Sequence, residues 1–238
     1  MSVTQLYEKR SQSVLVVFSG GQDSTTCLYW AKKNFQEVKT VSFDYGQKHE
    51  IETESAKKIC ELAGLEFDLV KIPEVLRSSS ALVNKNESLG KYEKIEDLPG
   101  GLEPTFVPAR NILFLTIAAN IAMSHGIRDI VIGVCEEDFG GYYDCRQDFI
   151  NAMQLALSQG ILGTDEGIRI HTPLMKLTKA ETVKLAQKLG DDCMQALAYS
   201  HTCYDGVFPP CGKCHACHLR ARGFKEAGIS DPLLSPRV

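Results

Sequence analysis

The sequence predicts an α/β fold built around a parallel sheet, and three observations support this prediction. Apolar runs rich in β-branched residues recur along the chain, at positions 14–18, 38–45, 66–72 and 129–134. Stretches with helical spacing lie between them, at positions 24–33, 49–63 and 111–125. The alternation shows neither an internal repeat nor a low-complexity tract. Because strand–helix–strand units bring successive strands together in parallel, we expect a doubly wound parallel sheet.

The individual elements carry local signals of their own. Residues 14–18, VLVVF, are five consecutive apolar residues, as expected of a strand that is buried on both faces. Gly64 follows the second helical stretch and predicts its C-terminal end. Residues 76–104 break the alternation with Ser, Asn, Gly and charged side chains, so we interpret them as a long excursion from the sheet.

The pattern resumes after the fourth strand. We expect a helix near 148–159, an edge segment at 168–172 and a helix over 179–189. Thr178 and Glu181 have the spacing of a capping box at the start of this last helix. We therefore assign residues 1–198 to an α/β domain and residues 199–238 to a metal-binding C-terminal tail.

Bulk properties narrow the class of protein. The chain has 238 residues, 44% of them hydrophobic, and a formal net charge of −4, which argues against a surface built to neutralise nucleic-acid phosphates. The first twelve residues lack an apolar signal-peptide core. The longest apolar helical candidate, 112–123, is shorter than the roughly 20 residues that a bilayer span needs. We expect a cytoplasmic protein without a nucleic-acid or membrane partner.

The first chemical motif is Ser19-Gly-Gly-Gln-Asp-Ser24, which directly follows the first strand and opens the first helix. A helix N-terminus at the carboxyl edge of a parallel sheet offers backbone N–H groups to an anion. The glycines let those groups approach a phosphate, and Asp23 suits a Mg²⁺ ion that bridges phosphate oxygens. No Gly-Lys-Ser/Thr and no Rossmann glycine pattern is present. An ordinary strand-to-helix turn remains the alternative.

This motif resembles the pyrophosphatase loop of the ATP-pyrophosphatase superfamily, at Ser19, Gly20, Gly21, Asp23 and Ser24. The resemblance implies an adenine nucleotide alpha hydrolase-like fold that cleaves ATP between its α and β phosphates and transfers AMP to a substrate oxygen. It assigns catalysis to Asp23 and Ser24. The residues that would surround the nucleotide are Phe18, Ser19, Gly20, Gly21, Gln22, Asp23, Ser24, Thr25, Thr26, Cys27 and Leu28.

Two further positions lie where an ATP site would form. Asp44 closes the second strand, where a carboxylate can accept hydrogen bonds from a ribose or base; alternatively it begins a turn before Gly46. Arg110 stands at the start of an apolar helix, where a cation opposes the helix dipole and is better used to bind an anion such as triphosphate or a substrate carboxylate. We assign Arg110 a catalytic role together with Asp23 and Ser24, with a structural ion pair as the alternative.

The segment after the fourth strand, residues 133–146, mixes acids, glycines, aromatic residues and an arginine. Such a loop suits a pocket for a flat polar heterocycle, since aromatic faces stack on the ring and carboxylates accept from its N–H groups. We assign substrate contacts to Tyr143, Asp144 and Arg146. Cys145 is expected to pack inward, because no companion base for a nucleophile is evident.

The nine cysteines are unevenly distributed, and this favours a metal site over disulfides. Four cluster near the C-terminus with short spacings, at Cys203, Cys211, Cys214 and Cys217. Four thiolates suit a closed structural zinc site, although the run of three-residue intervals also resembles iron–sulfur ligation. The other five are expected to be buried free thiols: Cys27, Cys60, Cys135, Cys145 and Cys193.

Together, five motifs resemble the 7-cyano-7-deazaguanine synthases, a bacterial family of queuosine precursor synthesis: FSGGQDSTTC, FDYGQKHE, FVPARN, GGYYDCR and CYDG…CGKCHAC. The resemblance spans Val14 to about Arg222. It implies a homodimeric ligase that converts 7-carboxy-7-deazaguanine, ammonia and ATP into a nitrile, with Zn²⁺ on the four clustered cysteines. Tyr143, where proline is expected, departs from the family pattern, as does the stretch 199–202.

Two other functions stay open on the sequence. A tRNA-modifying sulfur transferase of the same superfamily would need a catalytic cysteine pair and a basic RNA-binding surface, and the acidic pI of about 5.9 counts against it. A zinc-ribbon binding module with a degenerate ATP site would not need Asp23 and Ser24, which are intact.

Overall fold

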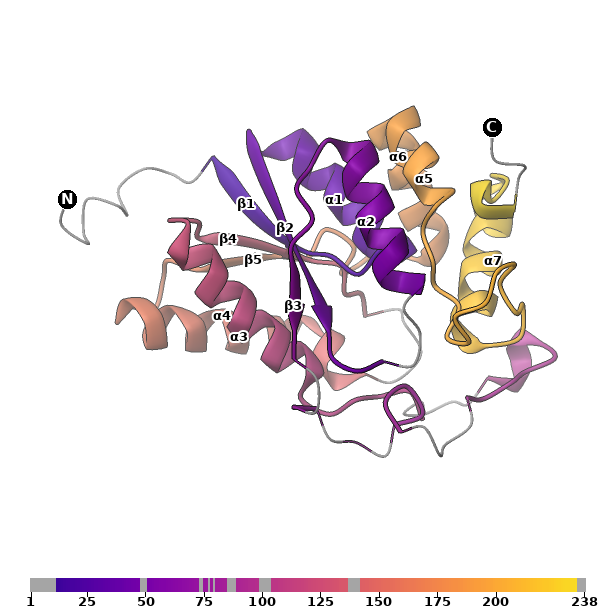
Figure 1. Ribbon diagram of the computed structural model, residues 1–238, viewed down its shortest axis with the longest axis horizontal. Helices are drawn as coiled ribbons and strands as arrows, with labels where there is room; N and C mark the ends of the chain where they lie inside the picture. Colours follow the sequence, from indigo (N-terminus) through magenta and orange to yellow (C-terminus); the bar gives the residue numbers. More distant parts are fainter. Residues whose placement is uncertain are drawn as a thin grey trace.

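The computed structural model describes residues 12–47, 51–72, 75–76, 78, 80–84, 89–98, 104–136 and 142–234. Five parallel strands form one sheet in the order β3-β2-β1-β4-β5 (Figure 1). The strands are β1 (Ser13–Val17), β2 (Glu37–Asp44), β3 (Leu69–Lys71), β4 (Asp129–Ile132) and β5 (Arg169–His171). The predicted parallel α/β fold is therefore confirmed.

Helices cover both faces of the sheet (Figure 1). They are α1 (Gln22–Asn34), α2 (Ile51–Ala63), α3 (Arg110–Ser124), α4 (Gln147–Leu162), α5 (Lys179–Leu189), α6 (Asp191–Leu197) and α7 (His215–Ala227). Short 3-10 turns occur at η2 (Ile95–Asp97), η3 (Tyr143–Cys145) and η4 (Pro232–Leu234). In the described part of the chain, no helix is long and apolar enough to cross a membrane.

Strand β1 divides the core into two layers, because its side chains alternate between the faces of the sheet. Val14 and Val16 pack with α1, α2, α5 and α6 on one face. Leu15 and Val17 pack with α3 and α4 on the other face. All four side chains are buried, which explains why the β1 sequence is apolar throughout rather than alternating.

The direction of winding reverses between β1 and β4. The chain runs from β1 outward to β2 and β3, and then crosses back so that β4 pairs with the opposite side of β1. At such a switch point the loops after neighbouring strands diverge and leave a crevice beyond the carboxyl ends of the strands. The SGGQDS segment follows β1 and therefore lies at this crevice.

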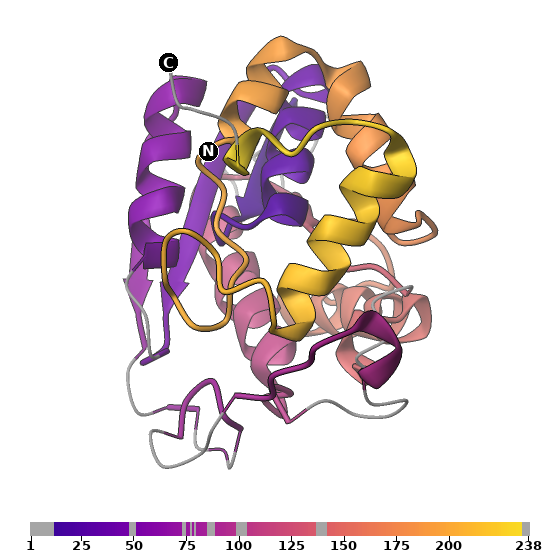
Figure 2. The ribbon, with the colours of Figure 1, turned by 90° about the vertical axis from the view of Figure 1, so that its right-hand side faces the viewer.

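The C-terminal tail lies against the α/β domain and forms part of its surface. Helix α7 packs against α5, and Figure 2 shows α7 in front of the α5–α6 region. Gly223 of α7 permits this close approach, since a Cβ there would lie 2.9 Å from Lys179 Cβ. Arg220 donates two hydrogen bonds to Asp231 and one to the Leu197 carbonyl. The division at residue 198 stays a prediction.

Candidate active site

The SGGQDS segment forms a tight turn that is fitted against α2. Gly20 has φ +80°, and a Cβ on it would lie 2.6 Å from the Ala56 nitrogen and 2.8 Å from the Glu52 carbonyl oxygen. Only glycine meets both conditions, the left-handed backbone and the close approach. Ser24 Oγ accepts a hydrogen bond from the Ser19 nitrogen over 3.3 Å and so closes the turn.

A cavity of about 300 Å³ opens at this turn, beyond the carboxyl ends of β1, β2 and β4. Of the predicted nucleotide-binding residues, Phe18, Ser19, Gly21, Gln22, Asp23 and Ser24 line it. Gly133, which follows β4, brings that strand end against α1, because a Cβ there would lie 3.1 Å from the Ser24 nitrogen. The start of α1 thus faces the crevice, as an anion-binding helix N-terminus requires.

Residues 25–28, the last four of the predicted nucleotide-binding residues, lie in the interior of the protein. Thr25 and Thr26 are buried, and their hydroxyls donate to the carbonyls of Gly21 and Gln22. Cys27 and Leu28 lie in the core beneath α1. None of these four lines the cavity. A contact between these four side chains and a nucleotide stays a prediction that the described geometry does not favour.

Asp44 begins a turn before Gly46, which is the alternative interpretation of this residue. Its Oδ1 accepts a hydrogen bond from the Gly46 nitrogen over 3.1 Å, and Gly46 has φ +83°. This is the local turn that Asp commonly stabilises. The cavity is instead lined by the next residues of the loop, Tyr45 and Gln47, so a ribose contact by Asp44 stays a prediction.

Asp23 and Lys179 form an ion pair at the base of the cavity. Lys179 Nζ donates to Asp23 Oδ2 over 2.7 Å, and the lysine side chain is only 7% exposed. Lys179 begins α5, directly after Thr178, whose hydroxyl and Glu181 form the predicted capping box. The capping box was recognised in the sequence, but the part that Lys179 takes in the cavity was not.

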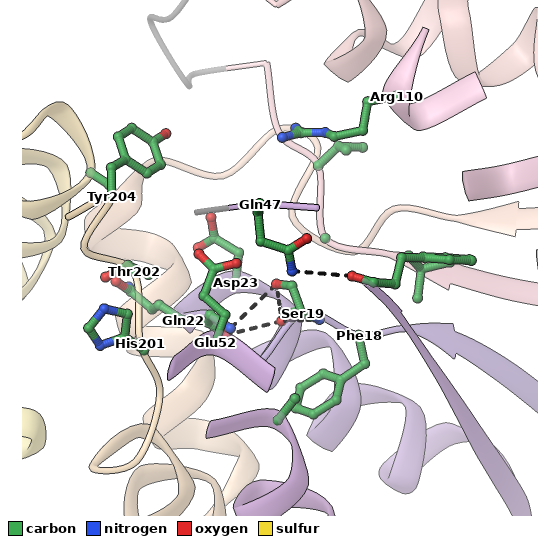
Figure 3. A pocket seen from close by; sticks show the side chains of 18 of the residues that line it. Phe18, Ser19, Gln22, Asp23, Gln47, Glu52, Arg110, His201, Thr202 and Tyr204 are labelled. Atoms are coloured by element: carbon green, nitrogen blue, oxygen red, sulfur yellow. Dashed lines mark hydrogen bonds between the residues drawn. The ribbon is translucent and has the colours of Figure 1, made fainter. Parts of the chain in front are cut away.

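Arg110 begins α3 and lines the cavity from another side (Figure 3). Burial by itself would lower the pKa of the guanidinium group, but Tyr45 and Asp144 outweigh it and hold the pKa above its ordinary value. Burial raises the pKa of the nearby Tyr45 phenol and outweighs the charge of Arg110, which lowers it. Arg110 thus combines a cavity position with internal acidic neighbours, so both interpretations of this residue have support.

The three predicted substrate contacts lie in two different environments, one buried and one at the surface. Asp144 is buried, and its carboxylate accepts a hydrogen bond from the Asn111 nitrogen, behind the start of α3. Tyr143 is 62% exposed, and Arg146 lies over its ring at 5.3 Å. None of the three lines the described cavity, whereas Tyr142 and Cys145 do. Residues 137–141 lie outside the described part of the chain, and the substrate contacts stay predictions.

Two parts of the cavity wall were not recognised in the sequence. Glu52 comes from the first turn of α2. Residues 201–204 of the tail line the cavity too, and the His201 nitrogen donates to the Gly20 carbonyl over 2.9 Å. The tail is therefore attached directly to the SGGQDS turn (Figure 3). No local motif marks these positions, since only tertiary packing brings them to the cavity.

The four clustered cysteines converge, as their spacing predicts. Their sulfur atoms all lie within 4.8 Å of one another, in Cys203, Cys211, Cys214 and Cys217. Backbone nitrogens of Cys211, Lys213 and Cys214 donate to these sulfurs, and such bonds favour the thiolate form that binds metals. This donor set fits a tetrahedral soft-metal site. The other five cysteines are buried and form no disulfide within the described residues.

Comparisons with known proteins identify the family of this chain. Residues 13–228 match the protein family described as "Queuosine biosynthesis protein QueC". A 7-cyano-7-deazaguanine synthase from Gloeobacter violaceus is 55% identical over 224 residues, which are 93% of this chain and 95% of that protein. The enzyme of the same name from Laribacter hongkongensis is 49% identical, covering 94% and 95%. That from Bacillus subtilis is 43% identical, covering 91% and 95%. The chain therefore belongs to the QueC family of queuosine biosynthesis proteins.

Proposed function

We propose that the protein is a ligase that converts 7-carboxy-7-deazaguanine, ammonia and ATP into 7-cyano-7-deazaguanine, a queuosine precursor. One observation carries the proposal: the SGGQDS turn opens α1 onto a cavity that also holds Lys179 and Arg110. Two cations and a helix N-terminus suit a triphosphate and a carboxylate bound side by side. The QueC relatives described above carry the name of this activity.

The turn suits the polyphosphate of ATP. Gly21 lines the cavity without a side chain, which leaves the approach to the first amides of α1 free, and Lys179 adds a positive charge beside them. A Mg²⁺ ion would take the Asp23 carboxylate as its protein ligand, because this group lies on the cavity wall at the first turn of α1. Such an ion would neutralise charge on the phosphates. Ser24 and Asp23 are thus the proposed catalytic residues of the turn.

Arg110 suits the acid substrate. A carboxylate is a poor electrophile, so its oxygen must first be turned into a leaving group. Transfer of AMP to that oxygen does this, with release of pyrophosphate, and ammonia then displaces AMP to give an amide. The amide oxygen must leave in the same way before a nitrile can form. We therefore propose two adenylations at one site, with Arg110 orienting the oxygen that attacks ATP.

The four-cysteine site suits a structural Zn²⁺ ion. Because Cys203, Cys211, Cys214 and Cys217 supply all four positions of a tetrahedron, no position is left for a substrate. Its apparent binding free energy, on the order of 10–16 kcal/mol, would stabilise the tail that carries His201. On the family resemblance we also propose a cytoplasmic homodimer that acts on small molecules and binds no nucleic acid directly.

The test is product analysis. Purified, metal-replete protein is incubated with 7-carboxy-7-deazaguanine, ATP, Mg²⁺ and ammonium chloride, and the products are identified by mass spectrometry. The proposal predicts the nitrile and two AMP for each nitrile formed. One AMP per nitrile would contradict the double adenylation, and neither AMP nor nitrile would contradict the function. Glutamine in place of ammonium should support no reaction, since the proposal takes free ammonia as the nitrogen source.

A further inference from the structure

The cavity contains two carboxylates with different surroundings. Among the described residues that line it, the acidic side chains are Asp23 and Glu52. Asp23 is paired with Lys179 over 2.7 Å. Glu52 has no hydrogen bond or ion pair to its carboxylate within the described ranges. Carboxylates held in contrasting surroundings commonly divide the acid and base work of a reaction between them.

Glu52 is fixed beside the nucleotide turn. It lies in the first turn of α2, and its carbonyl oxygen would be 2.8 Å from a Cβ on Gly20, so the two backbones are in contact. Figure 3 shows its side chain on the same side of the cavity as Asp23. With the phosphates of ATP at the SGGQDS turn, as proposed above, a group in this position would lie near them.

The charged and titratable groups that face Glu52 come from three other elements. They are Arg110 of α3, His201 and Cys203 of the tail, and Tyr45 of the loop after β2. Burial raises the pKa of Glu52, and the opposite effects of His201 and Arg110 do not cancel it. The Arg110 charge also interacts with the Asp144 carboxylate. Because Glu52 lines the cavity, its carboxylate is open to a cation or a proton from the substrate side.

The proposed reaction needs such a group. At neutral pH ammonia is present mainly as the ammonium ion, which has no lone pair and cannot attack a carbonyl carbon. We propose that Glu52 binds this ammonium ion and accepts its proton in the amide-forming step, an inference that rests on the function proposed above. The carboxylate attracts the cation, and removal of the proton creates the nucleophile next to its target.

In the amide-forming step, an N–H bond of ammonium breaks and its proton moves to a Glu52 carboxylate oxygen. The freed lone pair forms a C–N bond to the acyl carbon, and the C–O bond to AMP breaks with its electrons leaving on AMP. A second proton then leaves the nitrogen. Acyl adenylate and ammonium thus give amide, AMP and two protons, without an oxidant or reductant.

The experiment separates adenylation from amide formation. Glu52→Gln is compared with Glu54→Gln, a matched change at an exposed position of the same helix. Acid-dependent exchange of labelled pyrophosphate into ATP reports adenylation alone. We expect exchange within threefold of the unaltered protein for both variants. For Glu52→Gln we expect kcat/KM for ammonium to fall at least about a hundredfold, as for loss of a general base.

A second nucleophile makes the test specific. Hydroxylamine is a much weaker base than ammonia and is unprotonated at neutral pH, so it needs no proton acceptor. We expect Glu52→Gln to form the hydroxamate at a rate within threefold of the unaltered protein. A purely structural role for Glu52 would lower the rates with both nucleophiles together. Glu52→Asp, which keeps a carboxylate, should retain part of the ammonium reaction.

Several results would overturn the inference. Ammonium kinetics of Glu52→Gln equal to those of Glu54→Gln would exclude the role, and loss of pyrophosphate exchange would place Glu52 in ATP or metal binding instead. Should Glu52→Gln fail to fold, Glu52→Asp with unchanged ammonium and hydroxylamine rates would also argue against it. Absence of acid-dependent exchange in the unaltered protein would instead contradict the proposed function itself, so the two failures are distinguishable.

Discussion

Lys179 Nζ lies 2.7 Å from Asp23 Oδ2, although 156 positions separate the two residues in the chain. The lysine is held there by the tail, because Gly223 of α7 packs against its Cβ. An ion pair at the first turn of α1 places a positive charge where phosphates are expected. The C-terminal part of the chain thus helps to build the proposed ATP site.

Replacement of Lys179 by methionine should weaken ATP binding. The change removes a charge-assisted hydrogen bond, worth about 1.5–3 kcal/mol, and leaves the Asp23 carboxylate to repel the phosphates. We expect the KM for ATP to rise about ten- to hundredfold. Lys184→Met, at an exposed position of the same helix, is the control. Equal ATP kinetics for the two variants would show that Lys179 only stabilises α5.

Replacement of Gly20 by alanine, in the SGGQDS turn, should lower the free energy of unfolding by more than the strain of a positive φ alone. Gly64→Ala is the matched control, because Gly64 also has positive φ but has open space around its Cβ position. The control should lose about 1–2 kcal/mol of unfolding free energy from strain. Gly20→Ala adds a clash with the Ala56 nitrogen. Denaturant unfolding measures both, and equal losses would mean that the turn can move away from α2.

Metal analysis tests the four-cysteine site. We expect one Zn²⁺ per chain in the purified protein and its loss in Cys211→Ala, since three ligands leave the tetrahedron open. Cys193→Ala, which changes a buried cysteine of the core, should keep its zinc. Hydrogen exchange at residues 203–217 should accelerate when a chelator removes the metal. Iron with sulfide would favour the iron–sulfur alternative, and full zinc content in Cys211→Ala would contradict the ligand set.

Asp129 should make stability depend on pH in the acidic range. Burial raises its pKa, but hydrogen bonds from His171 and Arg169 outweigh this, so the pKa lies below its ordinary value. A carboxyl with a lowered folded-state pKa stabilises the protein above its unfolded pKa, and the contribution is lost as pH falls through the folded value. Asp129→Asn should therefore be about 1–3 kcal/mol less stable than the unaltered protein at pH 7.

The pH dependence is the decisive part of that measurement. The difference in unfolding free energy between Asp129→Asn and the unaltered protein should shrink as pH falls below about 4, the ordinary pKa of Asp. Asp68→Asn, at an exposed position, should show no such trend. A stability difference for Asp129→Asn that stays constant from pH 7 into the acidic range would mean that its carboxylate is not selectively stabilised in the folded protein.

Local sequence patterns were sufficient to predict most of the sheet and the principal motifs. Val14 to Phe18 are apolar because the strand is buried on both faces, and this signal is independent of the rest of the chain. The capping box at Thr178 and the helix stop at Gly64 depend on neighbouring residues alone. The four cysteines were recognisable because metal geometry restricts their spacing.

The features that the sequence did not reveal are those that depend on long-range packing. Lys179 and Glu52 are ordinary residues of amphipathic helices until folding brings them to one cavity. Helix α6 has only seven residues, and α7 begins within the cysteine motif, so neither shows a clear helical period. Strand β3 is restricted to Leu69–Lys71, shorter than predicted, and the strand pairs with β2 alone.

Transfer of AMP to the oxygens of the acid substrate is the central step of the proposed reaction, and isotope tracing tests it most directly. 7-Carboxy-7-deazaguanine labelled with ¹⁸O in both carboxyl oxygens is converted in unlabelled water, and AMP, phosphate and pyrophosphate are analysed by mass spectrometry. We predict that both labelled oxygens appear in AMP, one from each adenylation. Label in inorganic phosphate, or release of unlabelled AMP, would contradict the account.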